Sequence, residues 1–167
     1  MWKKKFSIIT VVLNAKEDLI ETIKSLKEQS HKDFEYIIID GGSTDGTIEV
    51  INKNLDIIDK WISEKDSGIY DAMNKGIDLS EGNYIGMLNA GDKYMPNALS
   101  IINGYLNSHN IDFIFGSVMK KVLRYGLRKY RIYWNFDFAS SHSSGFFIKN
   151  EAQKKLGKYN LKYKISS

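Results

Sequence analysis

The chain has 167 residues, of which 43% are apolar and 26% are charged, a composition typical of a globular domain with a sizeable core. It contains no cysteine, which excludes disulfide bonds and thiolate metal sites, and no apolar run approaches the roughly 20 residues of a membrane-spanning helix. The net charge of +4 is unevenly distributed, because residues 1–115 carry a formal charge of −6 and residues 116–167 one of +10.

The basic C-terminal part has two interpretations that the composition leaves open. Such an excess of Lys and Arg suits a face for anions, whether phosphates, anionic lipid headgroups or nucleic acid. It is equally typical of a solvated surface whose acidic complement lies in a segment beyond Ser167.

The first residues predict a strand rather than a signal peptide. Met1–Lys5 is basic, but the apolar stretch Phe6–Leu13 is short and no small-residue cleavage site follows it. Its β-branched residues predict a strand buried on both faces. We therefore expect a cytoplasmic protein.

Strands and helices are expected to alternate through the first 115 residues. Apolar residues at helical spacing, Ile20 among them, predict a helix over residues 16–29, with Asn14 and Glu17 as its capping box. Such alternation predicts βαβ units, a mostly parallel sheet and an α/β fold. Further strands are expected at Phe34–Ile39, within Asp56–Ser63 and at Tyr84–Leu88, and further helices from near Thr44 or Asp45, over Ile69–Leu79 and near Pro96–Asn107.

The last third predicts a mixed part of the same domain. After a strand at Phe113–Val118, the segment Val122–Trp134 alternates partly in period two around Gly126, as an antiparallel hairpin does. A short strand at Gly145–Lys149 and a short helix at Glu151–Leu156 follow. We expect one domain over residues 1–167.

Polar residues follow four of the expected strands at the point where each strand ends. They are Thr10–Asn14, Asp40–Ser43, Glu64–Gly68 and Asn89–Asp92. In an open α/β sheet the ligand crevice lies beyond the carboxyl ends of the strands. The four clusters therefore predict one ligand site.

Two acidic motifs carry the specific expectations for that site. Asp40, followed by two glycines that permit close approach, can accept hydrogen bonds from a base or ribose; taken alone, Asp40 and Asp45 are more typical of Asx-turns and a helix cap. Asp92 and Asn89 offer oxygen ligands for Mg²⁺ or Mn²⁺, or they form a turn in which Asp92 caps the next helix.

Two further motifs give less specific predictions about the ligand site. Asp71, Asn74 and Lys75 lie on one expected helix face, where Lys75 could meet a phosphate or remain solvated. His142 lies in a serine-rich loop and could contact a phosphate or sugar, although a lone polar histidine is as common. No Walker or G-x-G-x-x-G motif is present, which argues against an ATPase or a dinucleotide-binding protein.

Several segments together resemble the inverting family 2 glycosyltransferases, which have the GT-A fold and use nucleotide sugars. The segments are Phe6–Asn14, Asp40–Thr47, Glu64–Ile77, Gly82–Asp92 and His142–Lys149, and they extend over nearly the whole chain. DGGSTDGT and SGIYDAMNKGI are quite specific in combination. The resemblance implies a three-layer α/β/α sandwich in which residues 1–115 hold the donor and residues 116–167 begin the acceptor side.

The resemblance also implies the roles of individual residues. Asp92 matches the metal-binding carboxylate, so that Mg²⁺ or Mn²⁺ is the implied cofactor. The implied contacts to the nucleoside diphosphate sugar are Thr10, Val11, Asn14, Asp40, Gly41, Ser43, Asp66, Gly68, Asp71, Asn74, Asn89, Ala90 and His142.

The chain departs from the family pattern at three places. Relatives often have an Asp that reads uracil where this chain has Gly41. The metal motif is usually richer in Asp than Asn89–Asp92. The family's catalytic Asp base follows a segment like Leu156–Ser167 and is therefore expected beyond Ser167, as in a C-terminally truncated chain.

The implied function is sugar transfer from a nucleoside diphosphate donor to a hydroxyl acceptor in bacterial cell-surface polysaccharide synthesis. A glycan or lipid-linked acceptor would permit peripheral contact with the inner face of the membrane. The first alternative is an inactive donor-binding remnant. The second, a nucleic-acid-binding module, rests on interleaved basic and aromatic residues in Lys120–Arg131; the acidic crevice argues against it, so no nucleic acid is expected.

Overall fold

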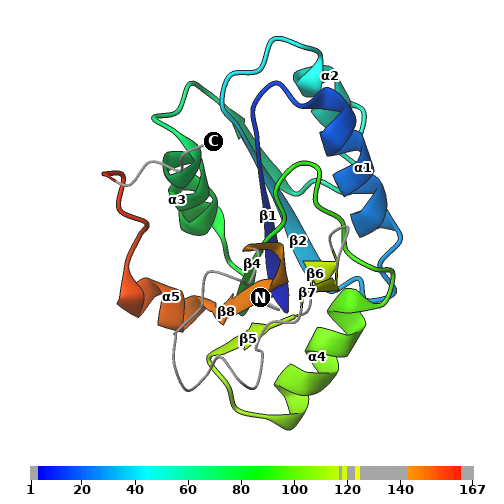
Figure 1. Ribbon diagram of the computed structural model, residues 1–167, viewed down its shortest axis with the longest axis vertical. Helices are drawn as coiled ribbons and strands as arrows, with labels where there is room; N and C mark the ends of the chain where they lie inside the picture. Colours follow the sequence, from blue (N-terminus) through cyan, green and yellow to red (C-terminus); the bar gives the residue numbers. More distant parts are fainter. Residues whose placement is uncertain (1–3, 117, 120–122, 125–142, 163–167) are drawn as a thin grey trace.

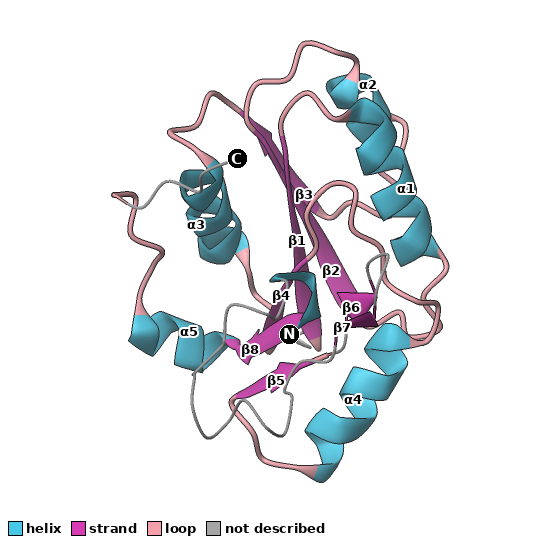
Figure 2. Cartoon of the chain, in the orientation of Figure 1, coloured by secondary structure: helices cyan, strands magenta, loops and turns pink. Residues whose placement is uncertain are grey.

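The fold is a six-stranded sheet between two layers of helices (Figures 1 and 2). The computed structural model describes residues 4–116, 118–119, 123–124 and 143–162. The strand order is β3-β2-β1-β4-β8-β5. The strands are β1 (Phe6–Val12), β2 (Phe34–Asp40), β3 (Lys60–Ser63), β4 (Tyr84–Met87), β5 (Phe113–Phe115) and β8 (Phe146–Lys149), and the helices are α1 (Lys16–Lys27), α2 (Thr47–Asn52), α3 (Ile69–Leu79), α4 (Ala98–Ser108) and α5 (Asn150–Leu156).

Strand β1 is the centre of the parallel part of the sheet. All seven of its residues are buried, and so are all seven of β2. Strand β1 pairs in parallel with β2, from Phe6 opposite Phe34 to Val12 opposite Asp40. On its other edge, β1 pairs in parallel with β4. Strand β3 extends the parallel sheet beyond β2.

Successive residues of the central strands enter two different cores. Ile8 and Ile38 pack in one core with residues of α1, α2 and α4, whereas Ile9 and Ile37 pack in the other with α3. Figure 1 shows α1, α2 and α4 to one side of the sheet and α3 and α5 to the other. The predicted three-layer α/β/α sandwich is confirmed.

Helix α3 lies against β1 with a glycine at the point of contact. A Cβ placed on Gly76 would overlap the Cγ2 atom of Ile9, in the middle of β1. The absence of a side chain at this position therefore allows the helix to approach the central strand.

The C-terminal part is mixed, as expected. Strand β8 pairs antiparallel with both β4 and β5, and α5 follows it directly. In a two-stranded antiparallel pair, β6 (Val118–Met119) precedes the segment of the predicted hairpin and β7 (Leu123–Arg124) lies within it. Most of Val122–Trp134 and of Lys120–Arg131 lies outside the described residues. Within the described ranges, no helix has the length and apolarity that crossing a membrane requires.

A buried carboxylate joins three strands at the amino edge of the sheet. Ser7 Oγ donates to Glu35 Oε1 over 2.5 Å. The N–H groups of Glu81 and Gly82 donate to the same oxygen over 2.6 and 2.9 Å. Lys60 Nζ lies 3.1 Å from the other oxygen of Glu35. Burial acts to raise the pKa of Glu35, but these hydrogen bonds outweigh it and hold the pKa below its usual value.

We expect Glu35→Gln to lower the free energy of unfolding by about 1–3 kcal/mol at pH 7, because buried donors lose their charged acceptor. Because the pKa of Glu35 is lower in the folded protein, its carboxylate contributes its full stabilisation above the unfolded-state pKa of about 4.3. This contribution is lost as the pH falls through the lower folded-state pKa. Urea unfolding from pH 7 to pH 3 should show the two proteins converging below about pH 4. Glu28→Gln, at an exposed position, is the control. A stability difference independent of pH would contradict this assignment.

Candidate functional site

The strand order reverses next to β1, and the polar loops meet at that point. From β1 the chain proceeds to β2 and β3 on one side and then to β4 on the other. The crevice between two loops that leave in opposite directions is the usual ligand site of such sheets. Gly41 N–H donates to Val12 O over 2.9 Å, and Ala90 N–H donates to Val11 O over 3.4 Å. The loops after β1, β2 and β4 are therefore joined at one edge.

The loops after β1 and β2 hold each other through side chains. The N–H of Asn14 donates to Ser43 Oγ over 2.7 Å, and the N–H of Thr44 donates to Asn14 Oδ1 over 2.8 Å. Asn14 has a φ of 47°, in the left-handed region that Asn tolerates better than most residues. Its predicted role as a helix cap is wrong, because its side chain serves the neighbouring loop and Ala15 is the cap residue of α1.

Asp45 joins the first turns of two helices. Its Oδ2 accepts the N–H of Lys16, the first residue of α1, over 3.0 Å. Its Oδ1 accepts the N–H of Thr47, the first residue of α2, over 3.0 Å and the Thr47 hydroxyl over 2.6 Å. The hydroxyl bond is the largest cause that lowers the pKa of Asp45. Helix α2, predicted to begin near Thr44 or Asp45, begins at Thr47 with Gly46 as its N-cap residue, and Asp45 precedes it.

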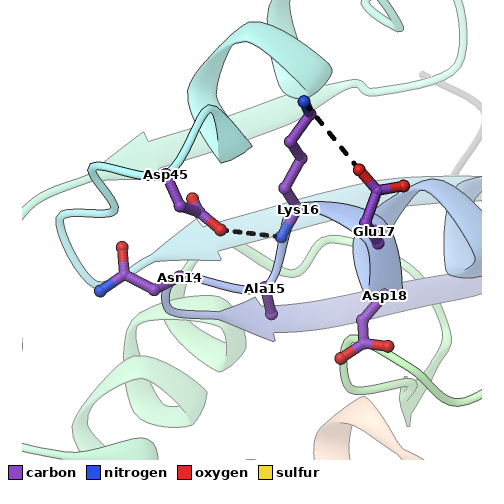
Figure 3. Close-up of a pocket in the computed structure, with 6 residues that line it drawn as sticks. All are labelled: Asn14, Ala15, Lys16, Glu17, Asp18 and Asp45. Atoms are coloured by element: carbon purple, nitrogen blue, oxygen red, sulfur yellow. Dashed lines mark hydrogen bonds and ion pairs between the residues drawn. The ribbon is translucent and has the colours of Figure 1, made fainter.

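An open pocket of about 480 Å³ lies at this junction (Figure 3). Its lining carries three carboxylates and one lysine, and Figure 3 shows the hydrogen bond between the Asp45 carboxylate and the backbone of Lys16. The lining residues are Asn14, Ala15, Lys16, Glu17, Asp18 and Asp45.

Asp40 is fully buried at the end of β2 and organises the loop that follows. Its Oδ2 accepts the N–H groups of Gly42 and Ser43 over 3.1 and 3.0 Å, and Ser63 Oγ over 2.7 Å. Its Oδ1 is buried and has no hydrogen bond from the described residues. The carboxylate thus forms the predicted Asx-turn and ties the turn to the end of β3.

Thr10 and Val11 are buried within the sheet rather than displayed at its edge. Thr10 Oγ1 donates to Leu88 O over 2.6 Å and accepts the Tyr36 hydroxyl over 3.0 Å. The Thr10 hydroxyl is therefore engaged between β1, β2 and β4, and its contact with a ligand stays a prediction.

The residues of α3 that were expected to face a ligand have partners within the protein. Asp71 Oδ2 accepts the N–H of Ser67 over 2.9 Å, and this bond is the largest cause that lowers the pKa of Asp71. Lys75 Nζ lies 2.8 Å from a carboxylate oxygen of Glu64 and 3.5 Å from one of Asp71. These contacts fix the loop after β3 on the first turns of α3.

Asn74 connects α3 to the segment that follows α5. Its Nδ2 donates to Tyr159 O over 2.9 Å, and the Tyr159 N–H donates to its Oδ1 over 2.8 Å. The rings of Tyr70 and Tyr159 stack with centroids 5.2 Å apart. Asn74 is thus a docking residue for residues 157–162, a long-range role that the sequence did not reveal.

The loop after β4 carries the candidate metal ligand. The Asp92 N–H donates to Asn89 O over 3.0 Å, and Asp92 O accepts Thr22 Oγ1 over 2.9 Å, which anchors the turn to α1. Burial first, and then the charge of Asp92, raise the pKa of the Tyr94 hydroxyl. Asn89 Nδ2 donates to Ser143 Oγ over 3.2 Å, whereas the buried Asn89 Oδ1 accepts no hydrogen bond from the described residues.

The structure therefore brings the four predicted clusters to one edge, although several of their side chains have internal partners. Asp66 and Gly68 lie in the loop after β3, joined by the bond from Gly68 N–H to Asp66 Oδ1 over 2.9 Å. His142 lies outside the described residues. Sequence reasoning missed Asp45 as a residue shared by two helices, because its second partner is remote in the chain.

Comparison with known proteins agrees with this geometry. Residues 7–165 match the profile of the family described as Glycosyl transferase family 2. The PGL/p-HBAD biosynthesis glycosyltransferase of Mycobacterium bovis is 30% identical over 96% of this chain, and the match covers 65% of that protein. The putative teichuronic acid biosynthesis glycosyltransferase TuaG of Bacillus subtilis is 35% identical over 59% of this chain and 40% of its own length. The chain thus covers less than two thirds of either relative.

Solved structures show the same fold. S. aureus TarS superposes with a TM-score of 0.77 at 18% identity, over 95% of this chain and 31% of that one. The mannosyltransferase PcManGT from Pyrobaculum calidifontis, solved with GDP-Man and Mn²⁺, superposes with a TM-score of 0.70 at 16% identity, over 96% of this chain and 48% of that one. The predicted GT-A-type architecture is confirmed.

We expect Asp45→Ala to lower the melting temperature, because two helices lose an acceptor for their first-turn N–H groups. Hydrogen exchange should accelerate at the N–H groups of both Lys16 and Thr47. Asp56→Ala, which removes an exposed carboxylate paired with Lys27, is the control and should leave both amides protected. Acceleration at only one helix would contradict the shared cap.

Asn74→Ala should release the segment 157–162 from α3, because it removes both hydrogen bonds to Tyr159. We expect faster amide exchange at Tyr159 and a loss of unfolding free energy of about 1–3 kcal/mol. Lys158→Ala removes only an exposed ion pair in the same segment and should cost at most about 1 kcal/mol. Equal effects of the two variants would show that Asn74 does not dock the segment.

Proposed function

The chain belongs to glycosyl transferase family 2, and from that premise we propose that it binds the nucleoside diphosphate sugar of a transfer to a hydroxyl acceptor. The observation that carries the proposal is the meeting of four polar loops where the strand order reverses, at one edge of the sheet. Ligands with a nucleoside and a diphosphate bind at such edges in open α/β sheets.

The nucleoside end is proposed to lie against the loops after β1, β2 and β3. The loop after β2 is held by Asp40, and its Gly41 lies beside Asp66 of the loop after β3. Asn14 and Ser43 join the β1 loop to the same surface. These bonds exist in the protein alone, so the surface is preorganised and a ligand need not order it on binding.

The diphosphate end is proposed to lie against the loop after β4, together with Mg²⁺ or Mn²⁺. No group of three metal-ligating side chains occurs among the described residues. Asp92 supplies one carboxylate in this loop, and the buried Asn89 Oδ1 accepts no hydrogen bond from the described residues. This sparse set fits a cation that takes its other oxygens from phosphate and water, as Mg²⁺ commonly does. When bound, the cation would neutralise charge on the departing diphosphate.

Transfer itself requires a base. In the proposed reaction the acceptor oxygen bonds to the anomeric carbon, the bond from that carbon to the diphosphate oxygen breaks, and the acceptor proton passes to a carboxylate. The described residues give no carboxylate that role. The resemblance assigns it to an acidic motif that follows a segment like Leu156–Ser167, so transfer is proposed on that resemblance, whereas donor binding is proposed from the described residues. Donor binding without turnover remains the alternative.

The acceptor class follows from the relatives alone. Their names concern PGL/p-HBAD and teichuronic acid biosynthesis. By analogy we propose a glycan or lipid-linked hydroxyl acceptor in a bacterial cell-surface pathway, in the cytoplasm and with peripheral contact at the inner face of the membrane.

Thermal unfolding with UDP-, GDP- and TDP-sugars, each with and without Mn²⁺, tests donor binding. We expect one nucleotide class to raise the melting temperature, because a ligand that binds only the folded state stabilises it by mass action. The shift should depend on Mn²⁺ and disappear in Asp92→Ala. The control is Asp78→Ala, an exposed carboxylate on α3 that pairs with Lys158. A shift independent of metal would remove Asp92 from its role, and no shift with any donor would refute the proposal.

A further inference from the structure

A glycine is needed at position 41 because there is little space for a side chain there, and not because of its backbone conformation. Gly42 has a positive φ of 89°, whereas Gly41 is not among the residues with positive φ. A Cβ placed on Gly41 would lie 2.6 Å from Asp66 Oδ2, which is closer than real contacts. The carboxylate of Asp66, from the loop after β3, therefore takes the space of a side chain on the loop after β2.

The Asp66 carboxylate is held at one oxygen and available at the other. Its Oδ1 accepts the N–H of Gly68 over 2.9 Å. Its Oδ2 has no hydrogen bond within the described part of the chain, and the side chain is partly exposed. An ionised carboxylate only accepts hydrogen bonds, so a ligand that meets Oδ2 must present a donor.

An apolar group also borders the same space. Leu13 Cδ1 is 3.3 Å from the position of the absent Cβ, and the Leu13 residue is 55% exposed. An exposed leucine beside a carboxylate oxygen suits a flat ring that is apolar on its face and has a donor at its edge. A nucleobase has this character, whereas a sugar has no apolar plane of that kind.

Bases differ in what their ring edge presents. Uracil, thymine and guanine carry a ring N–H beside a carbonyl, and this N–H can donate to a carboxylate. Cytosine and adenine carry a ring nitrogen that only accepts at the equivalent position, so it would face Oδ2 without a donor. A site built around a hydrogen bond rejects the analogue that cannot make it much more strongly than a site of shape alone.

We propose that Asp66 is the specificity-determining residue for the base, that its Oδ2 accepts a ring N–H, and that Gly41 makes room for it. The inference rests on the proposed donor binding and specifies it: the donor carries uracil, thymine or guanine, with Leu13 against the face of the base.

Binding of paired nucleoside diphosphates tests the proposal by calorimetry with Mn²⁺ present. UDP is compared with CDP, and GDP with ADP, so that each pair has bases of similar size. Wild-type protein should bind UDP or GDP at least about tenfold more tightly than its partner nucleotide. Asp66→Asn should reduce that ratio at least about tenfold, because an amide can turn its N–H₂ toward a ring nitrogen that only accepts.

Gly41→Ala provides an independent variant at the same site. Its backbone tolerates a side chain, but the added methyl group must displace Asp66 Oδ2, so the ratio should fall as it does in Asp66→Asn. Asp56→Asn, an exposed carboxylate on another loop, is the matched control and should keep the wild-type ratio.

The outcomes separate this inference from the proposed function. Tight binding of UDP or GDP with an unchanged ratio in both variants would overturn the role of Asp66 and leave donor binding intact. An equal loss of affinity for both members of a pair would show a structural role for Asp66 and would also overturn the inference. Failure of wild-type protein to bind any nucleotide would refute donor binding and the inference together.

Discussion

The structure depends above all on the parallel pairing of β1 along both of its edges. Because β2 and β4 run in the same direction as β1 and lie on opposite sides of it, the loops that leave these strands emerge at one edge. That pairing requires a strand buried on both faces, and every residue of β1 is buried. The candidate site is therefore a consequence of how the central strand is covered, before any polar side chain is considered.

The polar side chains at that edge form hydrogen bonds that stabilise the loops in the absence of a ligand. Asp40 and Asp45 use their oxygens to hold backbone N–H groups, and Asn14 does the same across two loops. An unpaired backbone group at a buried turn costs free energy, so these side chains are needed for the loops to keep one conformation. A surface ordered in this way loses little entropy on binding, which favours the affinity for a ligand.

Two loops contribute to one point of this surface, because the Asp66 carboxylate lies beside Gly41. Gly41 has no side chain, and the Asp66 carboxylate lies in the space that one would occupy. The chemical group at this point of the surface is thus supplied from the loop after β3. The sequence of the loop after β2 has a glycine, Gly41, where relatives often have an Asp. In the folded protein the carboxylate of Asp66 lies beside that position.

The elements near the start of the chain were predictable because each depends on local pattern. The bounds of α3 agree with the structure, and β1 differs only at its last residue, since apolar periodicity within a segment determines which face is buried. Ile20 was expected to face inward and is exposed, because the apolar stripe of α1 is narrower than its sequence suggests. The capping role given to Asn14 was wrong because a remote loop competes for its side chain.

The sequence by itself determined the α/β class and the set of loops that would share one edge, because periodicity and turn chemistry act over a few residues. The three-layer sandwich was an implication of the family resemblance. Only the tertiary structure decided what each polar side chain at that edge does. Asn74 was expected to face a ligand, yet it binds the backbone of Tyr159, which is 85 residues away. Partners of this kind are set by strand order and helix packing, which local spacing along the chain does not specify.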